Sequence, residues 1–254
     1  LAAGAAHGLP GVVFHEAALG SVPASVEDPL RFQEVNSTGS VRVLRAARKA
    51  NAARLIYAAS SSAYGDQPDL PKVETQIPQP LSPYAQTKLS AEHMLAVWSA
   101  CYGLSTISLR YFNIFGPRQR ADTAYAAVIA AFASALLRDE QATIFGDGEQ
   151  TRDFTCVDNV VQANLLAGAC PKDLKGEVVN IGMGGQVSIN ELYRLMAAAL
   201  GKEAQPLYAD VRAGDVMHSR ADISLARDLI GYDPQVSVEE GLKKTMEWYR
   251  ENDE

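Results

Sequence analysis

Short runs of apolar residues alternate with longer helical segments along the first half of the chain. Residues 11–15, 55–59 and 104–109 form runs of strand length that are rich in apolar side chains, as is typical of strands buried on both faces. Residues 35–50 and 83–102 lie between these runs and predict two helices. The alternation of strand and helix indicates a parallel sheet that helices cover on both faces.

The helix predicted at 83–102 has clear start and stop signals. Ser82 is a preferred N-cap residue, Pro83 occupies the first helical position, and Gly103 follows the last one. These residue types at these positions favour a helix with both ends defined.

The second half of the chain predicts a different arrangement. We expect helices at 125–137, 157–169, 188–200, 223–230 and 238–249. We expect strands at 142–145 and 177–181. The last of these strands is expected to rejoin the parallel sheet, and the other elements to form a second, smaller unit. The fold class is therefore α/β.

Composition and charge exclude several classes of protein. The 254 residues suffice for one large or two modest domains, and the net charge of −7 lacks the basic excess expected of a nucleic-acid-binding protein. No apolar run reaches the ~18–20 residues of a membrane helix, and the first residues have no signal-peptide pattern. Cys101, Cys156 and Cys170 are odd in number and widely spaced, which fits a cytoplasmic location and argues against a disulfide framework or a metal site.

The strongest chemical signal is a tyrosine and a lysine one helical turn apart. Tyr84 and Lys88 stand at i and i+4 of the predicted helix, so their side chains share a face. A free tyrosine has a pKa of about 10, and a nearby ammonium favours the phenolate and lowers that pKa. The run Ser60–Ser62 follows the predicted strand 55–59, at the end of a parallel strand where ligands usually bind. The pattern predicts a proton-transferring tyrosine with a serine beside it.

Several further motifs in chain order carry a resemblance to a known family. They lie at 15–18, 36–39, 57–65, 82–88, 110–113, 146–154 and 212–215. On these motifs the chain resembles the extended short-chain dehydrogenase/reductases, specifically the NAD-dependent nucleotide-sugar epimerases, and among them the bacterial UDP-N-acetylglucosamine 4-epimerases. The resemblance implies a Rossmann-like doubly wound parallel sheet. Residues 1–115, with 153–185 returning to them, would belong to the NAD-binding domain, and residues 116–254 mainly to a UDP-sugar-binding domain.

The resemblance also implies the roles of individual residues. The catalytic set would be Ser60, Tyr84 and Lys88, and no metal is implied. The residues lining NAD would be Ala17, Ala18, Asn36, Ala58, Lys88 and Phe112. The residues contacting the UDP-sugar would be Ser61, Asn113, Thr143, Phe145, Arg152, Arg212, Asp215 and Ser219. Two arginines suit a doubly charged diphosphate, because each can form bidentate hydrogen bonds with it.

The implied reaction is 4-epimerisation of a UDP-hexose through a transient 4-keto sugar, with UDP-N-acetylglucosamine and UDP-N-acetylgalactosamine as the expected substrates. A UDP-glucose or UDP-glucuronate 4-epimerase is the enzymatic alternative, and a non-catalytic nucleotide-binding protein of the same fold is the alternative from another class. Dehydratases and decarboxylases of the family carry acidic residues where this chain has Ser61 and Ser62, so both are disfavoured. We also expect a homodimer that pairs through the helices at 35–50 and 83–102.

One family motif has no counterpart in this sequence. The family carries a G-x-x-G-x-x-G turn after its first strand, where backbone N–H groups approach the pyrophosphate of the dinucleotide. Gly4 and Gly8 lack the strand that should precede such a turn. We therefore expect about two strand-helix units of the family fold to precede Leu1, and weak NAD binding by the chain as given.

Overall fold

A four-stranded parallel sheet forms the centre of the protein. The computed structural model describes residues 11–119, 128–211 and 217–252. The strands of this sheet, in spatial order, are β1 (Val12–His15), β2 (Arg54–Ser60), β3 (Ser105–Tyr111) and β8 (Lys175–Ile181). Every neighbouring pair is parallel, so the carboxyl ends of all these strands lie at one edge of the sheet.

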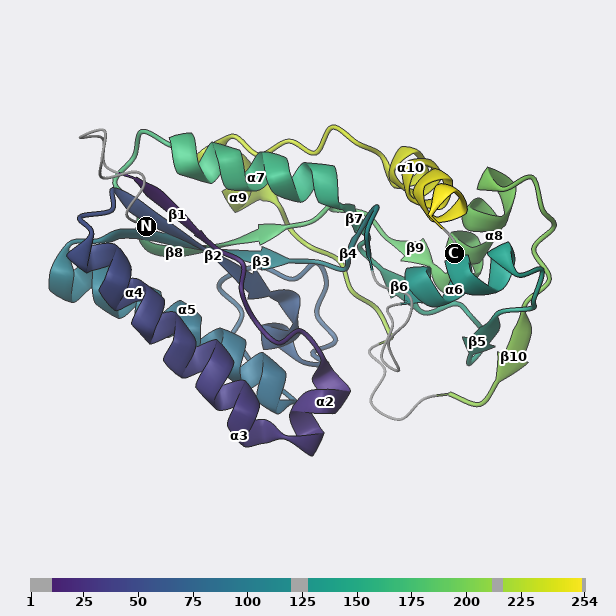
Figure 1. Cartoon of the computed structure of the whole chain (residues 1–254), viewed down its shortest axis with the longest axis horizontal. Helices are drawn as coiled ribbons and strands as arrows, with labels where there is room; N and C mark the ends of the chain where they lie inside the picture. The colour runs from purple at the N-terminus through teal and green to yellow at the C-terminus, as the bar shows by residue number, and fades with distance from the viewer. Residues whose placement is uncertain (1–10, 120–127, 212–216, 253–254) are drawn as a thin grey trace.

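Helices cover both faces of this sheet (Figure 1). One face packs against α4 (Gly39–Lys49) and α5 (Pro83–Tyr102), and the other packs against α7 (Val157–Ala169) and α9 (Ser224–Ile230). The α/β fold with a doubly covered parallel sheet, predicted from the sequence, is confirmed.

The residues of β2 show how alternation builds the two cores. Leu55, Tyr57 and Ala59 belong to the cluster on the α4/α5 side, whereas Ile56 and Ala58 belong to the cluster on the α7/α9 side. Successive side chains of a strand point to opposite faces. A strand buried on both faces therefore needs the uninterrupted apolar run that the sequence has here.

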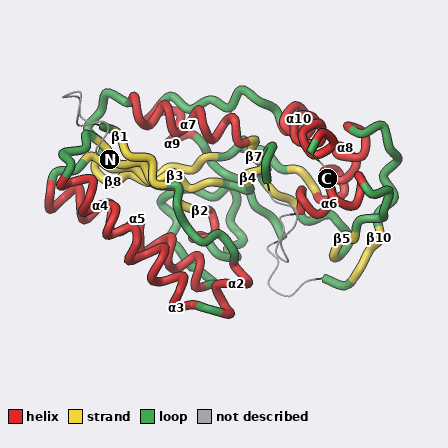
Figure 2. The backbone as a smooth tube through the Cα atoms, viewed as in Figure 1, coloured by secondary structure: helices red, strands yellow, loops and turns green. Residues whose placement is uncertain are grey.

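A third hydrophobic core lies beyond the carboxyl edge of the sheet (Figure 2). The helices that pack around it are α6 (Val128–Leu137), α8 (Ile189–Ala199) and α10 (Val238–Glu251). Three short strand pairs join this part: β4 (Ile114–Phe115) with β7 (Thr155–Cys156), β5 (Thr143–Phe145) with β10 (Leu207–Ala209), and β6 (Thr151–Arg152) with β9 (Val187–Ser188). The exact division of the chain into two domains stays a prediction.

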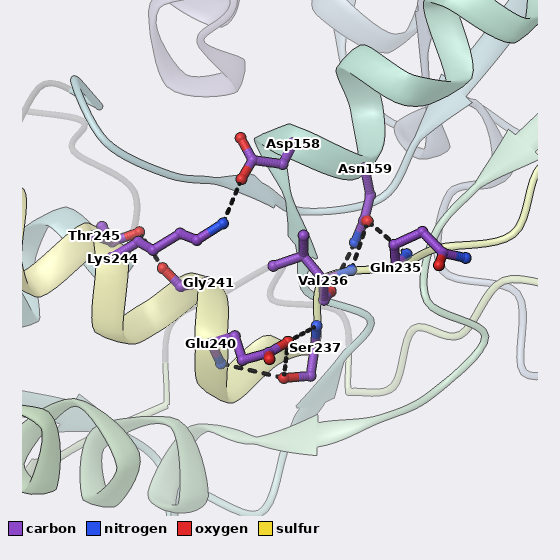
Figure 3. A network of polar contacts seen from close by, with 9 residues as sticks. All are labelled: Asp158, Asn159, Gln235, Val236, Ser237, Glu240, Gly241, Lys244 and Thr245. Carbon is purple, nitrogen blue, oxygen red and sulfur yellow. Dashed lines mark hydrogen bonds and ion pairs between the residues drawn. The ribbon is translucent and has the colours of Figure 1, made fainter.

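A polar network fastens the last helix to α7 (Figure 3). The Asn159 carboxamide oxygen accepts from the backbone N–H groups of Gln235 and Val236, at 2.9 and 3.0 Å. Ser237 caps α10 and forms a capping box with Glu240, an arrangement that satisfies two of the free N–H groups of a helix start. These contacts fix where α10 begins relative to the sheet.

The predicted ends of helices agree best with the structure where capping residues define them. Helix α5 runs from Pro83 to Tyr102, with Ser82 as N-cap and Gly103 in the left-handed conformation beyond it. The expectation of a helix at 35–50 was incomplete. Two short helices, α2 (Val22–Glu27) and α3 (Pro29–Phe32), and a π-helical stretch η1 (Gln33–Thr38) precede α4.

The boundary was missed because the capping residues there follow one another closely. Ser21 and Asp28 each accept a backbone N–H and start a new short helix. Strand β10 was not predicted from the sequence. The predicted helix start at 125 and the segment 1–10 lie outside the described residues.

In the part of the chain that the structure describes, no helix is long and apolar enough to span a bilayer. Nor do the described residues bring together a group of His, Cys, Asp or Glu side chains suited to a metal ion.

A buried ion pair ties α5 to β3. The Arg110 guanidinium donates to both carboxylate oxygens of Glu92, at 3.0 and 2.7 Å, and the two side chains are only 4% and 1% exposed. The guanidinium also lies 4.7 Å from the ring centre of Tyr64. Removing one partner of such a pair strands the other charge away from water.

We predict that Glu92→Gln lowers the free energy of unfolding by about 3–5 kcal/mol. The measurement is chemical denaturation of the variant and the wild type. Glu191→Gln is the matched control, because it breaks the exposed pair between Glu191 and Arg194, and exposed pairs contribute little. Equal destabilisation by the two variants would contradict the prediction.

Candidate active site

A cleft of about 630 Å³ opens at the carboxyl ends of β1, β2 and β3. Its walls come from the residues that follow these strands, from the first turns of α5, and from two segments of the second half of the chain. The residues concerned are Glu16, Ala18 and Gly20, Ala58–Ser62, Tyr111–Ile114, Tyr84 and Lys88, Arg152, and His218 and Ser219, among others. Open parallel sheets characteristically bind ligands at this edge.

The tyrosine and lysine of α5 both line the cleft. Lys88 is 4% exposed, and its Nζ donates to the backbone oxygen of Ala58 at 2.7 Å. The same Nζ lies 4.9 Å from the ring centre of Tyr57. The lysine therefore bridges the helix to the end of β2 and holds the first turns of α5 against the cleft.

Burial dominates the pKa values of this pair. Burial raises the pKa of Tyr84, and a hydrogen bond with Ser60 opposes that rise. Burial also lowers the pKa of Lys88 to about 8, against the influence of Glu16 and Glu92. In the protein groups alone, desolvation of the phenol outweighs the hydrogen bond with Ser60. The expectation that Lys88 lowers the Tyr84 pKa together with a bound cationic cofactor stays a prediction.

The serines at the end of β2 are organised around Ser60. The Ser60 hydroxyl oxygen accepts from the Ser62 backbone N–H at 3.2 Å and from the Ser62 hydroxyl at 2.9 Å. This cap starts a single 3₁₀ turn at Ser61. With its oxygen already accepting from Ser62, Ser60 can direct its own proton to the phenol of Tyr84, whose pKa it lowers.

The loop after β1 depends on Asn36. Its carboxamide oxygen accepts from the Leu19 N–H at 2.8 Å, and its Nδ2 donates to the Leu19 carbonyl at 3.1 Å. The same Nδ2 also donates to the Thr87 hydroxyl at 3.1 Å. Asn36 thus uses its side chain to shape the loop that carries Ala18 into the cleft, and it does not line the cleft itself.

Two backbone segments bring the substrate-side residues together. The Thr151 N–H donates to the Met217 carbonyl at 2.9 Å, and the Ser219 N–H donates to the Thr151 carbonyl at 3.1 Å. The Arg152 guanidinium donates to the carbonyls of Thr151 and Met217, at 2.9 and 3.2 Å. Arg152 and Ser219 therefore reach one wall of the cleft from distant parts of the sequence.

Most residues that the sequence singled out lie in this cleft. Those that line it are Ala18, Ala58, Ser60, Ser61, Tyr84, Lys88, Phe112, Asn113, Arg152 and Ser219. Ala17 and Asn36 lie in or beside the loop after β1 without lining the cleft, and Thr143 and Phe145 lie on β5, paired with β10. Arg212 and Asp215 lie outside the described residues. The individual roles stay predictions.

Sequence reasoning missed several polar residues of the cleft, namely Glu16, Tyr64, Lys72, Tyr111 and His218. Glu16 and Tyr111 follow the ends of predicted parallel strands, and this position alone could have indicated that they lie at the cleft. Lys72 and His218 gave none, since only the folded chain brings their segments to the sheet edge.

Comparison with known proteins identifies relatives over nearly the whole chain. The model of the NAD dependent epimerase/dehydratase family matches residues 3–182. The UDP-glucose 4-epimerase of Mycolicibacterium smegmatis is 39% identical over 242 residues, which are 95% of this chain and 76% of that protein. The resemblance noted from the sequence is thereby confirmed.

Two solved structures are also similar. A UDP-N-acetylglucosamine 4-epimerase from Methanobrevibacter ruminantium M1, in complex with UDP-N-acetylmuramic acid, is 40% identical with a TM-score of 0.90 and covers 94% of this chain and 76% of its own. A UDP-glucose 4-epimerase from Thermotoga maritima, with UDP-glucose, is 41% identical with a TM-score of 0.91 and covers 96% and 79%.

We predict that Lys88 titrates with a pKa of about 8, far below the ~10.4 of an ordinary lysine. The measurement is the pH dependence of the lysine Cε resonances, with Lys88→Met identifying the signal. Because the unfolded chain binds the proton more tightly, the stability of the wild type relative to Lys88→Met should rise between pH 8 and about 10.4. A Lys88 signal that titrates above pH 10 would contradict the prediction.

Proposed function

Because this chain belongs to the NAD dependent epimerase/dehydratase family, we propose that it catalyses the 4-epimerisation of a UDP-hexose. The observation that carries the proposal is the convergence of Ser60, Tyr84 and Lys88 in one cleft, with Arg152 on its far wall. Similar proteins named as UDP-sugar 4-epimerases support this reaction.

The described residues fit the nicotinamide end of NAD. A lysine ammonium has three N–H groups, and within the described chain the Ala58 carbonyl accepts one of those of Lys88. The remaining donors of this cleft-lining ammonium suit the hydroxyl oxygens of a ribose, and Phe112 and Ala58 supply apolar surface beside them. When bound, NAD accepts and returns the hydride and adds a positive charge to the site.

In the proposed mechanism Tyr84 takes the proton of the sugar's 4-hydroxyl on its phenol oxygen. Ser60, hydrogen-bonded to the Tyr84 phenol, orients the 4-hydroxyl of the sugar toward the phenol oxygen that takes its proton. Since burial raises the pKa of Tyr84, the ionised phenol needs positive charge, and the Lys88 ammonium contributes it. The same phenol returns the proton after the 4-keto sugar has turned over, while Arg152 retains the diphosphate.

The sugar we propose is an N-acetylated hexose. Ser219 lines the cleft as a small, half-buried side chain, and a small residue there leaves room for an acetamido group. UDP-glucose and UDP-glucuronate are the alternative substrates. Ser61 and Ser62 line the cleft where a dehydratase would carry acidic residues, which supports epimerisation. The presence of Tyr84, Lys88 and Ser60 together argues against a non-catalytic binding protein.

Dimerisation through the helices at 35–50 and 83–102 stays part of the proposal. Helix α5 carries exposed apolar side chains, with Val97 46% and Tyr102 45% exposed. Apolar surface of this kind on a helix face suits contact with a second copy.

We predict that Tyr84→Phe lowers turnover of UDP-N-acetylglucosamine by about 10²–10⁴-fold, the usual contribution of a positioned acid-base group. Dissociation of the UDP-sugar should change little, since the ring is kept. Turnover is followed by the appearance of the 4-epimer, and binding by calorimetry. Tyr102→Phe, at the exposed end of the same helix, is the control and should turn over normally. Near-normal epimerisation by Tyr84→Phe would remove the tyrosine from the chemistry.

We predict that Ser219→Tyr discriminates against N-acetylated sugars. Overfilling a packed site costs ~1–3 kcal/mol, or roughly 5- to 150-fold in specificity. The measurement is the ratio of kcat/KM for UDP-N-acetylglucosamine and UDP-glucose in the wild type and the variant. Ser224→Tyr places the same ring at an exposed serine of α9 and should leave the ratio alone. An unchanged ratio in Ser219→Tyr would take Ser219 out of the sugar pocket.

A further inference from the structure

A second pocket lies at the edge of the sheet opposite the cleft. Its volume is about 820 Å³, within the range of ~300–1,000 Å³ that is usual for pockets that hold small molecules. Ala52 and Leu104 line it, and they precede β2 and β3, whose carboxyl ends carry the cleft. Each of these strands has 7 residues, so roughly 20 Å of extended chain separates the two sites. A ligand of this pocket is therefore distinct from the ligand of the cleft.

Three cationic side chains line this pocket without an acidic partner. Arg45, Arg48 and Lys49 come from the end of α4 and are exposed. The described residues that line the pocket include no Asp or Glu, and the ion pairs within the described chain involve none of the three cations. A concave surface lined by one sign of charge concentrates ions of the opposite sign. The pocket is therefore suited to an anion.

The end of helix α4 accounts for only part of this charge. Cations in the last turn of a helix interact favourably with its free carbonyl groups, and Arg48 and Lys49 lie in that turn. Arg45 lies outside it. The Arg48 guanidinium also lies 4.2 Å from the ring centre of Tyr102, at the end of α5. A cation that packs on a ring of the neighbouring helix is already oriented before a ligand arrives.

The aromatic side of the pocket has an unused hydrogen-bond donor. Trp98 lines the pocket and packs edge-on against Tyr102, with 5.2 Å between the ring centres. Its indole N–H is buried and has no acceptor within the described chain. The N–H of a buried tryptophan usually has a partner, and leaving such a donor unpaired costs free energy. A ligand with oxygen acceptors would satisfy the donor after a small turn of the half-buried ring.

We propose that this pocket binds a phosphoryl anion, separately from the UDP-sugar cleft. The phosphoryl oxygens would accept from the guanidinium groups of Arg45 and Arg48 and from the ammonium of Lys49, because guanidinium groups bind phosphate in a bidentate manner. Trp98 would donate its indole N–H to the same ligand and pack against its organic part. Such an anion has two sources, a free diphosphate or a nucleotide, and the volume of the pocket favours the nucleotide.

The test follows the indole N–H signals of the 254-residue chain by ¹⁵N NMR during titration with ADP, inorganic pyrophosphate and adenosine. A salt concentration of ~0.15 M screens weak attraction to exposed charges. Trp98 and Trp248 are the two tryptophans of the chain, so Trp248, on α10, reports on effects elsewhere, and Trp98→Phe assigns the signals. We expect ADP and pyrophosphate to shift the Trp98 signal alone, and adenosine to leave it in place. Tighter binding of ADP identifies the nucleotide as the ligand, and equal binding identifies the free diphosphate.

A matched pair of variants tests the role of the cations. Because Arg45 donates charge-assisted hydrogen bonds in this proposal, Arg45→Gln should raise the dissociation constant of ADP by about 10- to 100-fold. Arg42→Gln is the control, because it removes the same charge from an exposed position of the same helix that does not line the pocket. It should keep the wild-type dissociation constant.

Three results would overturn the proposal. ADP and pyrophosphate could leave the Trp98 signal in place, which includes the case in which a second copy of the chain covers the pocket. Adenosine could shift the signal as strongly as ADP, which would make the pocket an apolar site. Arg42→Gln could weaken ADP binding as much as Arg45→Gln, which would make the attraction a general property of α4. The wild-type titration decides the matter even if a variant does not fold.

Discussion

The cleft depends on one hydrogen bond between helix α5 and the sheet. The Lys88 ammonium donates to the Ala58 carbonyl near the end of β2, and β2 and β3 are in parallel register with Ser60 opposite Tyr111. The hydrogen bond between Lys88 and Ala58 determines how close α5 lies to the sheet, and with it the position of Tyr84 one turn earlier. The register of β2 and β3 determines which residues lie at the carboxyl edge of the sheet. The geometry of the cleft therefore follows from how a helix is attached to a parallel sheet.

The other wall of the cleft depends on a buried carboxylate. Asp153 accepts from the backbone N–H groups of Met183, Gly184 and Ala221, at 2.7, 3.0 and 3.0 Å. Burial nevertheless raises its pKa to about 6, against these hydrogen bonds. The contacts join the end of β8 to the segment that carries Ser219, and Arg152 immediately precedes Asp153. One acidic side chain thus aligns the substrate-side wall with the sheet.

The sequence predicted the features that local chemistry determines. The i, i+4 spacing of Tyr84 and Lys88 and the caps at Ser82 and Gly103 define α5 without reference to the rest of the chain, and the structure has both. The apolar run of β2 likewise predicted a buried strand.

What the sequence did not predict depends on contacts between distant segments. The Asn36 side chain bonds Leu19 and Thr87, which lie far from it in the sequence, and its role toward the cofactor stays a prediction. The pKa of Tyr84 depends on how deeply the folded chain buries it, which spacing alone does not give. Lys72 reaches the cleft only because its loop pairs with residues about 150 positions later. No local sequence pattern predicts that such a residue lines the cleft.

The central claim is that one cleft removes and returns the same hydrogen at carbon 4 of a UDP-hexose. Its most direct test uses UDP-N-acetylglucosamine carrying deuterium at carbon 4, incubated with the protein and NAD and examined by NMR. The account predicts the 4-epimer with the deuterium still at carbon 4, because the hydride returns to the carbon that lost it. A 4-epimer that has lost the deuterium to solvent, or a dehydrated product in its place, would contradict the account.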